Sequence, residues 1–308
     1  MLENPKITVI LPTYNGGQFL AQSVESIIAQ TENDWELIIV NDCSTDNTLE
    51  IAEGFSAKDS RIQVITNRTN MKLPASLNIG FSKARGRYFT WTSDDNLYKP
   101  NALEIMAAYL DNRREVDFIT ANSDIIGEEG EVLKQKYNTA DIRLPVELIL
   151  GCNISAAFMY RREIAEAVGG YDENLFCAED YDYWCRIALA GNIGYINDNI
   201  YQYRKHKNSL STTKRKEAEK NKLLVQKKHL DAFCSKFCLS NIDRLKIAVI
   251  NKSNVIESTP IKLYPLFIFL KGYKLAVKLI AGLVFWDKAL RRKIRRRFSF
   301  SINSICKI

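Results

Sequence analysis

Apolar runs and helical segments alternate along the first 121 residues, and this alternation constrains the fold more than any other feature of the chain. The runs are short, poor in charge and bounded by turn residues, which is typical of strands buried on both faces of a sheet. Helices between consecutive strands place those strands in parallel. The sequence therefore predicts an α/β fold with a doubly wound, mostly parallel sheet. We expect strands at 6–12, 35–40, 61–65, 88–91 and 116–121, and helices at 19–28, 48–55, 73–84 and 101–110.

Polar residues follow three of the predicted strands at their carboxyl ends. Thr13 and Tyr14 follow the first strand, Asp42 the second, and Asp94 and Asp95 the fourth. In an open α/β sheet, ligands bind in the crevice outside these ends, so we expect the side chains to line one site. Adjacent carboxylates repel each other, and a divalent cation removes that cost. Taken alone, the Asp pair also suits a simple turn before a helix.

The segment after residue 121 is predicted to extend the sheet. We expect a hairpin at 122–137, a strand at 155–160, a helix at 161–168 and two edge strands at 194–197 and 200–203. Apolar spacing between residues 181 and 189 predicts a further helix, which Glu179 and Asp180 open. These two acids match the positive end of the helix dipole, and one of them is equally suited to act as a base. Both interpretations stay open at this point.

Charge is distributed unevenly along the chain. Residues 1–210 hold 20 Lys and Arg against 30 Asp and Glu, whereas residues 211–308 hold 23 against 6. This asymmetry predicts that the C-terminal region meets an anionic surface.

The seven Cys are odd in number and include no Cys-x-x-Cys pair, which favours a reducing compartment. Residues 1–5 lack the basic and apolar parts of a signal peptide, so we expect a cytoplasmic protein.

The C-terminal region, residues 212–308, is predicted to be helical and basic, with its first helix at 218–237. Residues 263–286 are strongly apolar but carry three Lys, so the uncharged runs are too short to span a bilayer. These Lys fall on one side of a helix, and a polybasic run follows at 291–297. We predict that residues 263–297 form an amphipathic helix on an anionic membrane surface, at its inner face; sedimentation with anionic vesicles tests this hypothesis. A helix docked on the rest of the protein is the main alternative. Nucleic acid is not expected, because it leaves the apolar side without a partner.

Several motifs in the first 210 residues together resemble family 2 glycosyltransferases, which have the nucleotide-diphospho-sugar transferase fold called glycosyltransferase-A. They occur in the order found in that family. The matching segments are Val9–Asn15, Val40–Asp46, Asn78–Gly80, Ala84–Tyr88, Ser93–Pro100, Gly169–Asp172 and Glu179–Arg186.

The resemblance implies roles for individual residues. Thr13 and Tyr14 would contact the nucleotide base and ribose, and Asp42 would bind the base. Asp94 would contact the ribose or the sugar, and Asp95 would hold a divalent cation, Mn²⁺ or Mg²⁺, on the diphosphate. Asp180 would be the catalytic base, which removes the proton of an acceptor hydroxyl. Such a general base typically contributes a factor of roughly 10²–10⁴ to the rate.

The chain departs from the family pattern at two positions. Thr92 stands where many relatives carry the first carboxylate of Asp-x-Asp-Asp, and Lys72 stands where Gly is common. We expect Lys72 and Arg68 to contact the donor's phosphate or base, with solvated loop charges as the alternative. His206 lies in a segment similar to the family's Arg-x-His-x-x-Ser-x-Ser motif. Because imidazole suits Mn²⁺, His206 is a candidate metal ligand; an exposed His in a basic loop is the alternative.

These observations lead to one expected function and two alternatives. We expect an inverting glycosyltransferase that moves a sugar from a nucleotide-diphospho-sugar, with a UDP-sugar favoured, to a hydroxyl of a glycan or lipid-linked acceptor in cell-surface polysaccharide synthesis. A nucleotidyltransferase would need a basic Gly-rich loop after the first strand, and a non-catalytic binding module would not need Asp95 and Asp180. The catalytic domain is expected at 1–211, with a nucleotide-binding half at about 1–121 and an acceptor half at about 122–211.

Overall fold

The computed structural model describes residues 4–136, 145–152 and 154–239. They belong to two compact units. The first contains the described residues up to 136 and from 154 to 221, and the second contains residues 145–152 and 222–239. The predicted helix at 218–237 is confirmed as α8 (Arg215–Lys236), whereas the segment 263–297, predicted to bind a membrane, lies outside the described residues. No helix in the described part of the chain is long and apolar enough to cross a bilayer.

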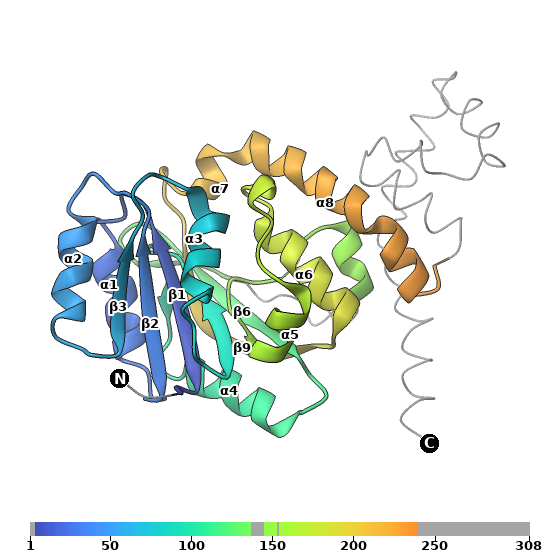
Figure 1. Cartoon of the computed structure of the whole chain (residues 1–308), viewed down its shortest axis with the longest axis horizontal. Helices are drawn as coiled ribbons and strands as arrows, with labels where there is room; N and C mark the ends of the chain where they lie inside the picture. The colour runs from blue at the N-terminus through green and yellow to red at the C-terminus, as the bar shows by residue number, and fades with distance from the viewer. Residues whose placement is uncertain (1–3, 137–144, 153, 240–308) are drawn as a thin grey trace. The chain divides into compact units, whose positions relative to one another are not determined.

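A single sheet runs through the first unit (Figure 1). Its nine strands, counted over the described residues, follow the order β3-β2-β1-β4-β8-β6-β9-β5, and β7 pairs with β6. The strands are β1 (Ile7–Thr13), β2 (Trp35–Asn41), β3 (Ile62–Thr66), β4 (Tyr88–Trp91), β5 (Leu97–Tyr98), β6 (Phe118–Ile126), β7 (Val132–Lys136), β8 (Phe158–Arg161) and β9 (Ile193–Arg204).

The first four strands form the predicted parallel half of the sheet. β1 pairs in parallel with β2 on one side and with β4 on the other, and β2 pairs in parallel with β3. Every residue of β1 and β2 is buried, as expected for mostly apolar strands covered on both faces. The connecting helices are α1 (Leu20–Ile28), α2 (Thr48–Ser56), α3 (Lys72–Phe81) and α4 (Ala102–Asn112).

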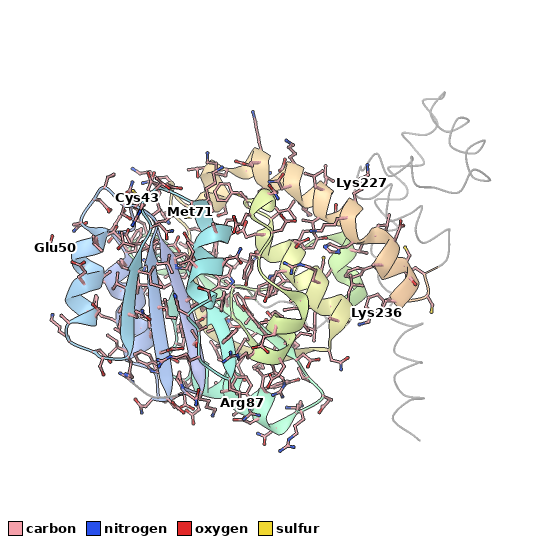
Figure 2. The ribbon with its side chains drawn as sticks, in the orientation of Figure 1. Cys43, Glu50, Met71, Arg87, Lys227 and Lys236 are labelled. Atoms are coloured by element: carbon pink, nitrogen blue, oxygen red, sulfur yellow. The ribbon has the colours of Figure 1, made fainter. Side chains whose placement is uncertain are left out.

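The strand order reverses at β1. The chain builds β1, β2 and β3 in one direction and then returns to add β4 on the opposite side of β1. Figure 2 shows Cys43, which follows β2, and Met71, which precedes α3, at one end of the sheet. Arg87, which precedes β4, lies at the other end. A crevice opens at such a reversal because neighbouring loops diverge to opposite faces, so a ligand site is expected between the carboxyl ends of β1 and β4.

The second half of the sheet contains antiparallel strands. β8 inserts between β4 and β6 and pairs antiparallel with both. The prediction of two edge strands was wrong, because residues 193–204 form one strand, β9, between β6 and β5. The polar stretch at 197–199 resembles a turn in the sequence, but its register shifts there, and Asn122 of β6 donates to the Asn197 carbonyl at 3.2 Å. A bulge therefore stands where a turn was expected.

Helices cover both faces of the sheet. On β1, Val9 and Leu11 belong to a core cluster that includes Leu20 and Val24 of α1, and this cluster also contains residues of α2 and α4. Ile10 points to the other face, where a Cβ on Gly80 of α3 would lie 2.6 Å from its side chain. The doubly wound arrangement predicted from the sequence is thus confirmed.

An aromatic layer fixes α6 (Glu179–Ala190) on the same face as α3. Trp184 packs against Phe118 and Phe158, with ring centroids 4.7 and 4.6 Å away. The loop before α6 is tied to α3 by Asn78, whose side chain accepts from the Tyr171 N–H at 2.7 Å and donates to the Tyr171 carbonyl at 3.0 Å. The start of α6 is therefore set by packing against the sheet and by hydrogen bonds between the preceding loop and α3.

We predict that Gly86→Ala destabilises the fold. A Cβ at this position would lie 2.5 Å from the backbone nitrogen of Thr8, which cannot move without disturbing β1. Overpacking of this kind costs about 1–3 kcal/mol in the free energy of unfolding, measured by urea denaturation. Gly54→Ala in α2 is the matched control, because a Cβ added there would have nothing within 4 Å and the change should stabilise the helix. Equal effects of the two substitutions would contradict this account.

Candidate active site

A hydrogen bond joins β1 to the acidic motif after β4, at the reversal of strand order. The Thr13 hydroxyl donates to Asp94 Oδ2 at 2.5 Å. Gly16 allows this contact, because a Cβ there would lie 2.0 Å from the same carboxylate oxygen. The bond links two residues that the sequence predicted for donor binding, and it fixes the direction of the Asp94 side chain.

The two adjacent carboxylates of Asp94 and Asp95 are both hard to ionise. Burial, followed by the charge of Asp95, raises the pKa of Asp94 to about 7. Burial also raises the pKa of Asp95, although the bond from His206 opposes that shift. Positive charge supplied from outside the protein would relieve this repulsion. The pair is therefore built to receive a cation or a cationic complex.

Asp95 and His206 provide a place for that cation. His206 Nε2 lies 2.9 Å from Asp95 Oδ2, and both side chains are largely buried. Their other polar atoms, Asp95 Oδ1 and His206 Nδ1, are buried and have no hydrogen-bond partner among the described residues. Carboxylate and imidazole are ligands that Mn²⁺ accepts. The residues present thus fit a divalent cation.

The rest of the coordination shell must come from elsewhere. Within residues 4–136, 145–152 and 154–239, no group of three or more His, Cys, Asp and Glu side chains is arranged to hold a metal ion. Two protein ligands are what is expected where the cation is shared with phosphate oxygens and water, as Mg²⁺ commonly is. A site of this kind binds its metal together with a phosphate-containing ligand.

Asp42, which follows β2, lines the pocket and holds the loop before α3 by hydrogen bonds. Its carboxylate accepts from the Asn67 side chain and from the backbone N–H groups of Met71 and Lys72, each at 2.8 Å. Asp42 is nearly inaccessible, with 4% of its surface exposed. Asp42 therefore holds the loop before α3 in place, and its carboxylate can accept few further hydrogen bonds.

Lys72 occupies a conformation that favours glycine. Its φ of 69° lies in the left-handed region, which accounts for the Gly common at this position in the family it resembles. The ammonium group lies 5.2 Å from the ring centroid of Phe176, and both residues line the pocket. Arg68, the other expected donor contact, is exposed and is not among the pocket-lining residues.

The departure at Thr92 does not face the pocket. Thr92 is 1% exposed, and its hydroxyl shares a hydrogen bond of 2.6 Å with Tyr201 of β9. The hydroxyl expected to replace the outermost carboxylate thus belongs to the sheet interior. Ser93, by contrast, lines the pocket.

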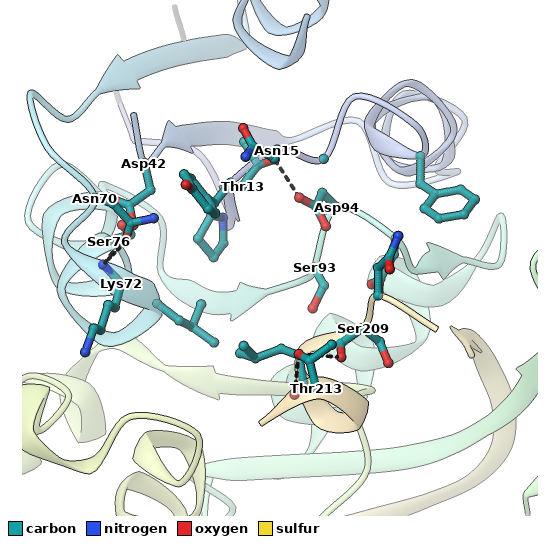
Figure 3. Close-up of a pocket in the computed structure, with 18 of the residues that line it drawn as sticks. Thr13, Asn15, Asp42, Asn70, Lys72, Ser76, Ser93, Asp94, Ser209 and Thr213 are labelled. Atoms are coloured by element: carbon teal, nitrogen blue, oxygen red, sulfur yellow. Dashed lines mark hydrogen bonds between the residues drawn. The ribbon is translucent and has the colours of Figure 1, made fainter. Parts of the chain in front are cut away.

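These elements enclose a pocket of about 400 Å³. Figure 3 shows Asp42, Asn70 and Lys72 on one side, Asp94 on the other, and Ser209 and Thr213 opposite Thr13. Tyr14, Asp95 and His206 also line it, and Tyr14 is half exposed. Seven of the nine predicted site residues lie here: Thr13, Tyr14, Asp42, Lys72, Asp94, Asp95 and His206.

Asp180 opens α6 and is not among the pocket-lining residues. Burial raises its pKa, while the Tyr181 N–H, which donates to Asp180 Oδ1 at 2.6 Å, lowers it. The pKa of the Tyr203 phenol is raised by burial and then by the charges of both Asp95 and Asp180. Asp180 on α6 and Asp95 after β4 therefore both influence the same phenol, that of Tyr203.

The site contains residues that the sequence did not single out. Asn208, Ser209 and Thr213 line the pocket from the segment after β9, and Arg204 lies buried beneath Asp95. The motif around His206 contained the signal for Arg204, since an Arg precedes the His by two residues. Its burial could not be foreseen, because Arg is usually exposed.

The fold and the site together define an enzyme of the nucleotide-sugar transferase class. The profile of "Glycosyl transferase family 2" matches residues 8–169, and the chain belongs to this family. An uncharacterized glycosyltransferase of Haemophilus influenzae is 28% identical over 99% of this chain and 100% of its own length.

Solved structures share the fold. TarS 1-349 of S. aureus, in complex with UDP-GlcNAc, is similar with a TM-score of 0.62 and 18% identity, covering 83% of this chain and 82% of that one. The mannosyltransferase PcManGT of Pyrobaculum calidifontis, in complex with GDP-Man and Mn²⁺, has a TM-score of 0.59 and 17% identity, covering 93% and 89%. The chain is thus a glycosyltransferase with the glycosyltransferase-A fold.

We predict that Glu179→Gln stabilises the protein in alkaline solution. Burial and the neighbouring Asp180 raise the pKa of Glu179 to about 8. The folded state therefore keeps a proton that the unfolded chain loses, so stability falls as the pH rises from the ordinary Glu range through the raised pKa. Gln carries no charge at any pH, so the variant does not lose stability by ionising a buried carboxyl.

Urea denaturation at about pH 5.5 and about pH 9 measures the effect. The variant's gain in unfolding free energy over the wild type should be larger at the higher pH. Glu163→Gln, at an exposed position, is the control and should change little at either pH. A gain that does not depend on pH would contradict the assignment.

Proposed function

We propose that the chain transfers a sugar from a nucleotide-diphospho-sugar to an acceptor hydroxyl with inversion, and that a divalent cation assists. The observation that carries the proposal is the Asp95–His206 pair, which lines the pocket beside Asp94 and retains buried polar atoms without a partner among the described residues. A cation bound there would offset the charge that grows on the leaving diphosphate. The two solved structures bound to nucleotide-sugars, one of them with Mn²⁺, support this interpretation of the site.

The donor is proposed to lie along the carboxyl ends of β2, β1 and β4. The base side is formed by Tyr14, Asp42 and Lys72, and the sugar-diphosphate side by Asp94 and Asp95. Lys72 adds a positive charge to the wall of the pocket, which suits a phosphate or a base carbonyl. We favour a UDP-sugar, since the Lys72 cation suits a carbonyl of a pyrimidine base and one of the similar solved structures holds UDP-GlcNAc.

Asp180 is proposed to take the acceptor proton. As the acceptor oxygen bonds to the anomeric carbon, the proton passes to the Asp180 carboxylate and the bond to the diphosphate breaks on the opposite side. This in-line step needs one base and gives inversion. Glu179 supports it, because a carboxyl that stays protonated near pH 7 adds no repulsion to an ionised Asp180.

Gly16 argues against the nucleotidyltransferase alternative. That reaction would use a Gly-rich loop to cradle phosphates, whereas the space above Gly16 is filled by Asp94.

The proposed acceptor is a glycan or a lipid-linked sugar in cell-surface polysaccharide synthesis, at the inner face of the membrane. The basic composition of residues 211–308 supports this part of the proposal.

Asp95→Ala tests the metal assignment. We expect UDP to bind the wild type more tightly with Mn²⁺ than without, and the variant to lose that difference, because it lacks the carboxylate proposed to hold the cation. Isothermal titration of UDP with and without Mn²⁺ measures the effect. Asp59→Ala, which removes a half-buried carboxylate paired with Arg61 and absent from the pocket lining, is the control and should retain the difference. Mn²⁺-dependent binding by Asp95→Ala would refute the assignment.

Asp180→Asn tests the catalytic base. The change is nearly isosteric, so UDP should bind as in the wild type, while sugar transfer should fall by roughly 10² or more. Transfer is measured with the nucleotide-sugar and acceptor on which the wild type turns over. Turnover close to that of the wild type would remove Asp180 from the mechanism and direct attention to Asp182 or Glu179.

A further inference from the structure

Arg204, the last residue of β9, is a buried cation next to the candidate metal site. It is 1% exposed. Its Nε donates to the Asp95 carbonyl at 2.9 Å, and its Nη2 donates to the Gln22 side chain at 2.7 Å. Its Nη1 donates to the carbonyls of Glu128 at 2.7 Å and Gly127 at 3.2 Å. Each acceptor is a neutral oxygen, so none of these bonds pairs the guanidinium with a carboxylate.

These contacts bring three elements to one point. The Asp95 carbonyl belongs to the acidic motif after β4, Gln22 belongs to α1, and residues 127–128 form the turn between β6 and β7. Arginine suits this position because its planar fork of donors has fixed directions. Lysine has a single ammonium group with three N–H donors, so it cannot bond all four oxygens.

Phe19 lies between Arg204 and His206 and contacts both side chains. The Arg204 guanidinium carbon lies 4.7 Å from the Phe19 ring centroid. The His206 ring packs edge-on against the same Phe19, with centroids 5.1 Å apart. His206 in turn contacts the Asp95 carboxylate at 2.9 Å. The contacts close a ring through Arg204, Phe19, His206 and Asp95.

We propose that Arg204 is a positioning residue that fixes Asp95 and His206 in the arrangement a divalent cation requires. It acts on Asp95 through the main-chain carbonyl and on His206 through Phe19. The inference rests on the proposed function, because it takes these two residues as the metal ligands. It assigns Arg204 no contact with the substrate.

Direct metal binding tests the inference. Mn²⁺ is titrated into the protein with saturating UDP, and free Mn²⁺ is measured by electron paramagnetic resonance. The variants are Arg204→Lys, Phe19→Leu and the double variant. Changes to groups that support metal ligands typically weaken metal binding by about 10–100-fold, and we expect each single variant to do so. The double variant should lose little more than either, because both act through one ring of contacts.

Arg161→Lys is the matched control. Arg161 is also buried, at 8% exposure, and donates to main-chain carbonyls of Val116 at 2.8 Å and Leu110 at 2.6 Å. We expect this variant and Arg204→Lys both to lower the melting temperature, but only Arg161→Lys to keep the wild-type affinity for Mn²⁺. The comparison separates the loss of a buried arginine from the loss of metal positioning.

The outcomes are distinct. If wild-type protein binds Mn²⁺ and both Arg204→Lys and Phe19→Leu retain its affinity, the inference is overturned while the proposed function stands. If wild-type protein with UDP binds no Mn²⁺, the metal assignment fails and the inference fails with it. Should Arg204→Lys not fold, Phe19→Leu decides alone, since Leu keeps the site apolar and removes both ring contacts.

Discussion

The hydrogen bond between Thr13 and Asp94 is the contact on which the rest of the site depends. It spans the reversal of strand order, where the carboxyl ends of β1 and β4 separate and leave a crevice. Because Gly16 has no side chain, the loop after β1 can lie against Asp94 without displacing it. The direction of one carboxylate is thereby fixed, and its neighbour Asp95 is turned toward His206.

The acids around the pocket have different tasks because their surroundings differ. Asp42 accepts three N–H groups and maintains the loop before α3. Asp95 retains a buried oxygen without a partner among the described residues, and is the one suited to a cation. Glu179 stays protonated near neutrality through burial and the charge of Asp180. Carboxyl groups of similar intrinsic acidity thus differ through their surroundings, and we propose a structural role for Asp42, a metal-binding role for Asp95 and a proton-accepting role for Asp180.

The features that could be predicted from the sequence are those set by local patterns. The strand at 88–91 was placed correctly because a buried run between turn residues is a local signal, and the parallel half followed from the alternation with helices. The insertion of β8 between β4 and β6 and the burial of Arg204 could not be predicted, since both depend on pairings between distant segments. Thr92 was misjudged for the same reason, because its partner Tyr201 lies on a strand far along the chain.

The position of β9 has a consequence for the order in which the protein matures. Asp95 and His206 are separated by 111 residues, and they meet only when β9 has paired with β6 and β5. A chain still being synthesised can complete the parallel half of its sheet, but it cannot form this pair until His206 has left the ribosome. The pair that we propose as the metal site is thereby absent from every shorter intermediate of synthesis.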